Sequence, residues 1–164
     1  MIKIRGGNER NMSRAKTFLL LGMVCILLTG CSNAFAKEEY NDTDKIVATE
    51  DKFAKEYSVF NPIDNGYSLV VEKFDGRETL WTKTIEENKE IQVEIRLSMS
   101  AGTAKIVHIE EDGNITTLIE YTSESSKEEN VVKTVSLKEG INRIKIVGYE
   151  CKDIDLELLS SDFE

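Results

Sequence analysis

The sequence predicts an all-β protein, an antiparallel β-sandwich of about eight strands preceded by a short helix. Three observations favour this class. Short β-branched and aromatic runs follow one another from Gly66 to the C-terminus. Turn residues separate these runs at intervals of about 8–14 residues. No helical pattern interrupts them, which favours packed antiparallel sheets over a fold that alternates strands and helices.

The N-terminal part of the chain has the pattern of an export signal. Arg14 and Lys16 precede an uncharged run of eleven residues, 18–28. A transmembrane helix needs about 20 apolar residues, so the run is too short to span a bilayer and favours a cleavable signal peptide. The run ends in Leu28-Thr29-Gly30-Cys31, an aliphatic residue and two small residues before a cysteine.

This ending resembles the lipobox of bacterial lipoproteins. The resemblance implies that residues 1–30 are removed, that Cys31 receives a diacylglyceryl group, and that the mature chain is anchored on the extracytoplasmic face of the cell membrane. Two acyl chains suffice for stable attachment. An alternative is cleavage by a general signal peptidase at Ala34-Phe35-Ala36. Met12 is an alternative start that leaves a compact, basic n-region.

Two segments separate the signal from the predicted strands. Residues 31–42 lack periodicity and are interpreted as a lipidated tether. Residues 43–60 are predicted to contain a short helix, because apolar side chains recur at helical spacing and Asp42 or Thr43 can cap its start. The only proline, Pro62, follows. The β-sandwich domain is therefore expected over residues 61–164.

The strands are predicted from hydrophobic alternation and turn chemistry. Alternation is clearest where Ile91, Val93 and Ile95 are separated by polar residues, as in a strand with one buried and one solvated face. Asp112-Gly113 is a strong hairpin signal. The predicted strands are 67–74, 78–85, 91–99, 104–109, 115–121, 131–137, 141–147 and 154–159. The pattern favours a jelly-roll-like sandwich, with an up-and-down barrel as the alternative.

Two stretches also resemble known families. Residues 135–148 and 154–158, with Gly140-Ile141-Asn142 before alternating aliphatic residues, are similar to the closing strands of carbohydrate-binding jelly rolls. Residues 102–114 are similar to strands in small uncharacterised lipoproteins of Gram-positive bacteria. These resemblances imply a β-sandwich fold and carry over no functional residue.

Charge and cysteine content narrow the function classes. The formal net charge is −9, and residues 1–30 carry five basic side chains and one acidic one, so the exported part has a net charge of −13. Such a surface disfavours nucleic acid, whose binding depends on lysine and arginine. After Cys25 leaves with the signal and Cys31 is lipidated, Cys151 is the remaining thiol, so no intramolecular disulfide can form.

Asp153, Asp155 and Glu157 form a candidate Ca²⁺ site. They alternate with aliphatic residues, so they share one strand face and could supply part of the six to eight oxygens that Ca²⁺ takes. The favoured alternative is a charge-paired surface. If residues 147–153 form a hairpin, Lys145 lies opposite Asp155 and Arg143 opposite Glu157. If the two strands instead lie in different sheets, these pairs do not form. No cofactor is expected for a charge-paired surface.

Aromatic residues form a candidate ligand site. Trp81 and Tyr149 could stack on sugar rings, together with Tyr67 and Tyr121, although Trp81 is more often a core residue in such a strand. Tyr149 beside Gly148 is the one most expected at the surface. His108, the only histidine, shares a face with Ala104 and Ile106 and is expected to be partly buried and structural.

No catalytic residue is predicted. A lone His108 without a second histidine or cysteine does not make a typical zinc site, and no nucleophile motif accompanies it. The acidic cluster Glu110-Glu111-Asp112 lacks the spaced ligands of a complete Ca²⁺ loop and is interpreted as a solvated turn.

The sequence therefore predicts a non-catalytic, lipid-anchored binding module for an envelope glycan or peptide. An alternative is a structural or protein-interaction lipoprotein, and a third is a hydrolase of wall polymer.

Overall fold

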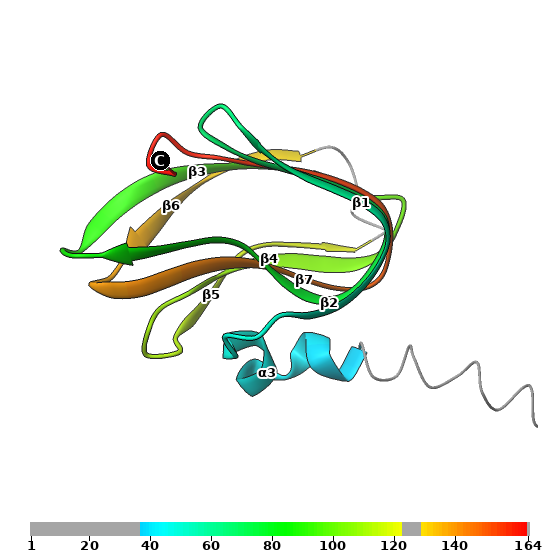
Figure 1. Ribbon diagram of the computed structural model, residues 1–164, viewed down its shortest axis with the longest axis horizontal. Helices are drawn as coiled ribbons and strands as arrows, with labels where there is room; N and C mark the ends of the chain where they lie inside the picture. Colours follow the sequence, from blue (N-terminus) through cyan, green and yellow to red (C-terminus); the bar gives the residue numbers. More distant parts are fainter. Residues whose placement is uncertain (1–36, 123–128, 164) are drawn as a thin grey trace, which may run out of the picture. The chain divides into compact units, whose positions relative to one another are not determined.

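The computed structural model describes residues 37–122 and 129–163, and these form two short helical segments and seven strands (Figure 1). The signal peptide of residues 1–30, Cys31 and most of the tether lie outside the described residues. After a helical turn at 37–41, the elements are α3 (Thr43–Val47), β1 (Lys52–Ile63), β2 (Gly66–Ile85), β3 (Lys89–Ser98), β4 (Ala101–Ile109), β5 (Ile115–Thr122), β6 (Glu129–Leu137) and β7 (Gly140–Leu159).

The strands form an antiparallel β-sandwich, which confirms the predicted fold class. β2 and β7 pair with each other along nearly their whole length and bend together from one layer into the other. The first half of β7 pairs with β4, which pairs with β5, whereas its second half pairs with β3, which pairs with β6. One layer therefore has the order β1-β2-β7-β3-β6 and the other the order β2-β7-β4-β5.

A corner with unusual backbone conformations allows the bend. Tyr57, Glu150 and Asp153 have positive φ of 39°, 54° and 50° on β1 and β7, the two strands that flank β2. Gly102, with φ of 92°, meets this corner from β4, and a Cβ there would lie 2.4 Å from the backbone of Glu150. Only glycine tolerates both the left-handed conformation and this approach.

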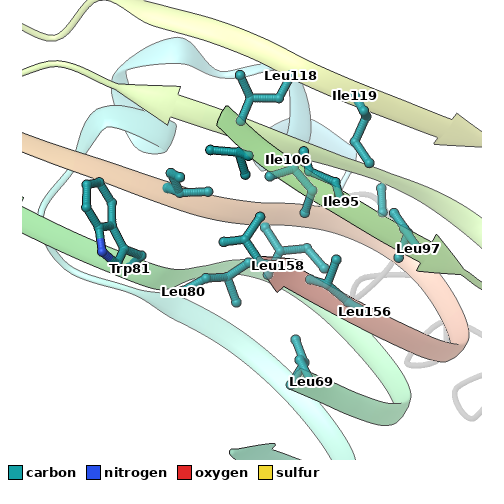
Figure 2. Packing of buried hydrophobic residues seen from close by; sticks show 14 of the residues in the cluster. Leu69, Leu80, Trp81, Ile95, Leu97, Ile106, Leu118, Ile119, Leu156 and Leu158 are labelled. Carbon is teal, nitrogen blue, oxygen red and sulfur yellow. The ribbon is translucent and has the colours of Figure 1, made fainter. Parts of the chain in front are cut away.

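The core lies between the two layers. Alternate residues of β3 point into it: Ile91, Val93, Ile95 and Leu97 are each at most 2% exposed, as the sequence alternation predicts. Figure 2 shows side chains of β3 and β4 meeting there with Leu156 and Leu158 of β7. A second, smaller cluster lies on the outer face of the β2-β7-β4-β5 layer, where residues of the N-terminal segment pack on Val107, Ile109 and Val147.

The helix expected over residues 43–60 is much shorter than predicted. Asp42 caps it as expected, accepting a hydrogen bond from the Lys45 N–H at 3.2 Å, but α3 ends at Val47. Residues 52–63 form strand β1 instead, and the sandwich begins there rather than at residue 61. Pairing with the edge of β2 supplies β1 with backbone hydrogen bonds, and this tertiary contact outweighs the local helical spacing.

Residues 147–153 do not form a hairpin, so the alternative of two segments in different sheets applies. The expected strands 141–147 and 154–159 are two halves of β7, just as 67–74 and 78–85 are two halves of β2. Because the halves lie in different layers, Lys145 does not face Asp155 and Arg143 does not face Glu157. Asp155 instead lies opposite Val70 and Ser98.

Candidate functional site

Trp81 is a core residue. Its side chain is 4% exposed and packs against Phe163, with ring centroids 5.1 Å apart. The indole therefore cannot stack on a ligand in this conformation, and the core interpretation of Trp81 applies.

Tyr149 is half-buried by the N-terminal segment. Its ring packs edge-on against Tyr40, with centroids 5.2 Å apart and an interplanar angle of 77°. Tyr40 also donates a hydrogen bond to Glu120 at 2.5 Å, and burial together with this bond raises the pKa of its phenol. Nothing in the sequence indicated that Tyr40 packs on Tyr149, because Tyr40 lies in the segment interpreted as a tether.

Asp153, Asp155 and Glu157 are not gathered around a common point. Glu157 pairs with Arg96, at 2.8 Å between Oε2 and Nη1, and Asp153 accepts a hydrogen bond from the Ser100 hydroxyl at 2.5 Å. Across residues 37–122 and 129–163, no three histidine, cysteine, aspartate or glutamate side chains form a group that could hold a metal ion. Glu157 and Asp153 are thus each engaged with a different residue outside β7.

His108 is buried, at 2% exposed, and its Nε2 lies 3.0 Å from Oδ1 of Asn142. Burial lowers the pKa of the imidazole, and the hydrogen bond to Asn142 only partly offsets this effect. Asn142 itself donates to the carbonyls of Lys138 and Gly140, at 2.7 and 3.1 Å. His108 therefore has the structural role that the sequence predicts.

Cys151 is buried, as His108 is. The thiol is buried at the corner of the sandwich, 3.2 Å from the carbonyl oxygen of Thr103. Burial, and secondly the charge of Asp75, raises its pKa to about 12. Reactive cysteines have lowered pKa values and accessible sulfur atoms, so this site is structural.

The acidic cluster at the β4–β5 connection is a hydrogen-bonded turn. Asp112 accepts bonds from the backbone and side-chain nitrogens of Asn114, at 3.0 and 2.7 Å. Glu111 accepts from the N–H of Ile141 at 3.1 Å. Internal pairing of this kind agrees with the predicted surface turn.

A pocket lies on the outer face of the β1-β2-β7-β3-β6 layer and has a volume of about 360 Å³. Polar and apolar surface contribute about equally to its walls, which include two carboxylates, two amides, two hydroxyls and two aliphatic side chains. The lining residues are Asp64, Asn65, Gln92, Glu94, Val132, Leu159, Ser160 and Ser161. The sequence analysis missed this pocket, because its residues come from four separate segments and carry no common motif.

The walls of the pocket are held by contacts between lining residues and with residues beside the pocket. The carbonyl of Asn65, in the β1–β2 turn, accepts a hydrogen bond from the Ser160 N–H at 2.8 Å. Arg96 donates to Glu94 through Nε at 2.8 Å and lowers the pKa of that carboxyl. Gln92 donates to the Thr134 hydroxyl at 2.9 Å. Side chains positioned in this way need little ordering when a ligand binds.

Exposed aromatic side chains gather on β1, an edge strand of the sheet. Phe53, Tyr57 and Phe60 are 44, 69 and 40% exposed, and Phe60 stacks on Tyr67 with centroids 5.7 Å apart. Among the described strands, β1 pairs with β2 alone, so its other edge presents backbone donors and acceptors that no described strand uses. The sequence analysis missed this surface because it assigned most of the segment to a helix.

Within the described parts of the chain, no helix has the length and apolar character needed to cross a membrane.

Comparisons with known proteins give similarity at the level of structure. No family model matches the chain, and no curated protein matches it.

Among solved structures, the chain is similar to the carbohydrate-binding module of Cellvibrio mixtus lichenase 5A in complex with cellotriose. The two are 13% identical, with a TM-score of 0.39, and the match covers 66% of this chain and 87% of that chain. A family 35 module from Paenibacillus barcinonensis is 11% identical with a TM-score of 0.36, covering 66 and 91%. A family 35 module from an environmental isolate is 17% identical with a TM-score of 0.33, covering 66 and 77%. Similarities of this size assign no ligand to the chain.

Proposed function

We propose that this protein is a lipid-anchored, extracytoplasmic binding module that holds an envelope glycan without altering it. The observation that carries the proposal is the polar pocket on the outer face of the β1-β2-β7-β3-β6 layer. Ligand sites in proteins commonly have volumes of about 300–1,000 Å³, and this open pocket lies at the lower end of that range.

The chemistry of the pocket suits a ligand rich in hydroxyl groups. The amides of Asn65 and Gln92 can both donate and accept hydrogen bonds, and the hydroxyls of Ser160 and Ser161 can do the same. Val132, which is 60% exposed, offers apolar surface to the face of a sugar ring. Arg96 balances the charge of Glu94, so the pocket does not select for a cation through that residue.

A hydrolase is less well supported. Glycoside hydrolysis needs a carboxylic acid whose pKa is raised, so that it can protonate the leaving group. Glu94 has the opposite property, because the hydrogen bond from Arg96 lowers its pKa.

The anchoring part of the proposal depends on the lipobox-like segment ending at Cys31. We expect a diacylglyceryl group on Cys31, which mass spectrometry of the mature protein from a lipoprotein-processing host would detect. An unmodified Cys31, or an N-terminus at Lys37, would contradict the anchor.

Glycan binding can be tested on residues 31–164 carrying Cys31→Ser, by calorimetric titration with wall glycans. We expect Gln92→Ala to raise the dissociation constant roughly 2- to 10-fold, since a hydrogen bond contributes about 0.5–1.5 kcal/mol. Glu90→Gln is the matched control. It lies two residues away in β3 but does not line the pocket, and it should leave the affinity unchanged. Equal weakening by both variants would contradict the assigned site.

A second candidate function is protein binding, which the free edge of β1 favours. An extended segment of a partner could pair with this edge, using backbone hydrogen bonds for affinity. A photo-reactive group placed at Tyr57 would then cross-link an envelope protein in intact cells, whereas absence of cross-links at this position would weigh against the candidate.

A further inference from the structure

The N-terminal segment before β1 is fixed to the outer face of the β2-β7-β4-β5 layer (Figure 1). Glu39, which is 3% exposed, forms a buried ion pair with Arg77 of β2 and a second one, at 3.2 Å, with Lys52. Tyr40 packs beside Tyr149, and the Nζ of Lys105 lies 4.4 Å above its ring centroid. Through these contacts the first helical turn, residues 37–41, is itself held on the sheet.

The end of α3 is held equally firmly. Arg143 donates to the carbonyl of Val47 at 2.8 Å and to that of Ala48 at 3.2 Å, and Lys145 donates to Ala48 at 2.7 Å. Cationic side chains at the C-terminal end of a helix satisfy its free carbonyls and complement its partial negative charge. Residues 39–51 therefore belong to the folded body and do not extend the tether.

From this docking we infer that the outer face of the β2-β7-β4-β5 layer is the side of the protein that faces the membrane. The inference rests on the proposed anchor at Cys31. Six residue steps join Cys31 to Lys37, and an extended chain spans at most about 3.5 Å per step, so the helical turn lies within about 21 Å of the anchor.

The arrangement of the layers extends the inference to the proposed binding site. The pocket lies on the outer face of the opposite layer, and two packed sheets are about 10 Å apart, with the N-terminal helices adding a further layer. While residues 39–51 stay docked, the covered face therefore lies nearer to the anchor than the pocket does. The pocket is on average turned away from the bilayer, toward the cell wall or the medium.

The charge of the covered face opposes its adhesion to the membrane. The exported part has a net charge of −13, and Glu38, Asp44 and Glu50 are exposed on the docked segment. These carboxylates are repelled by anionic headgroups. The tether, and not binding to lipid, holds the covered face near the membrane.

The test uses the full lipidated protein in vesicles whose headgroups carry an energy acceptor. A fluorophore is attached to Asp44→Cys on α3 or to Val132→Cys on the far layer. Cys151 is buried and Cys31 is blocked by lipid, so labelling is selective. We expect energy transfer at least twofold stronger from residue 44 than from residue 132.

A control separates orientation from anchoring. Inserting 20 Gly/Ser residues after Ala36 lengthens the tether by an average of about 25 Å and should reduce the difference between the two positions. Equal transfer from residues 44 and 132 in protein that floats with the vesicles would overturn the orientation while leaving the anchor intact. Protein that does not float, with an unmodified Cys31, would overturn the anchor and this inference with it.

Discussion

The ammonium group of Lys145, a side chain with no exposed surface, lies 3.1 Å from the carboxylate of Asp51. Burial alone would raise the pKa of Asp51, but hydrogen bonds from the backbone N–H and hydroxyl of Thr79, and from Lys145, outweigh it and lower the pKa. Burial lowers the pKa of Lys145. This pair joins the N-terminal segment to the first half of β7, and each side chain compensates the charge of the other.

Asp51→Ala should lower the free energy of unfolding by about 1–3 kcal/mol, because it leaves the buried ammonium of Lys145 with the Ala48 carbonyl as its remaining acceptor. Denaturant unfolding measures this loss. Glu56→Ala is the control: Glu56 pairs with Lys73, and both side chains are more than half exposed, so its effect should stay within about 1 kcal/mol. The double variant Asp51→Ala/Lys145→Met should be more stable than Asp51→Ala alone, since the buried ammonium that had lost its carboxylate is no longer present. A double variant less stable than the single one would contradict this account.

His108 should make the protein less stable as the pH falls from 7 toward 5. The pKa of its imidazole is lowered in the folded state, whereas the unfolded chain protonates near pH 6.5. Below that value the unfolded state takes up a proton that the folded state resists, so stability decreases until the folded pKa is passed. Because the chain has one histidine, a single NMR resonance reports the titration. A midpoint at or above 6.5 would show that the expected sign is wrong, and His108→Gln should flatten this part of the stability profile.

Gly102→Ala should be more damaging than Gly113→Ala. Both glycines have positive φ, 92° and 88°, so both substitutions carry the cost of a left-handed alanine, about 1–2 kcal/mol. At Gly102 a Cβ would also press on the backbone of Glu150, whereas at Gly113 its nearest contact is 3.9 Å away. We expect an additional loss of about 1–3 kcal/mol at Gly102, measured by thermal unfolding. Equal losses would mean that the corner relaxes around the new methyl group.

Cys151 should react with thiol reagents only when the protein unfolds. Its sulfur is buried and its pKa is raised to about 12, so little thiolate is available. In residues 31–164 with Cys31→Ser, alkylation of Cys151 should follow the rate of global opening, while Val132→Cys in the same chain should react immediately. Rapid modification of Cys151 under native conditions would reveal local opening of the corner.

Calcium should leave the melting temperature unchanged. Glu157 is paired with Arg96 and Asp153 with Ser100, so the acidic row would have to break these contacts to coordinate an ion. Thermal unfolding in Ca²⁺ and in EDTA checks this. A shift of several degrees between the two conditions would restore the calcium interpretation of these residues.

Sequence reasoning succeeded where a local pattern has a single structural consequence. The alternation of Ile91, Val93 and Ile95 predicted both the strand and the face that it buries, because side chains alternate strictly along a strand. The face of His108 was predicted for the same reason. Asp112-Gly113 marked a real connection between β4 and β5, because its turn conformation is a property of those two residues.

The sequence alone determined the β-sandwich class, the acidic character of the protein and the segments that could become strands, since these depend on composition and on short-range periodicity. Only the tertiary structure decided that β2 and β7 cross between the layers, that residues 52–63 become an edge strand, and that residues 39–51 dock on a sheet. The pocket formed by Asn65, Gln92 and Ser160 also belongs to this second group. Each of these outcomes depends on contacts between residues far apart in the chain, and such contacts leave no periodic trace in the sequence.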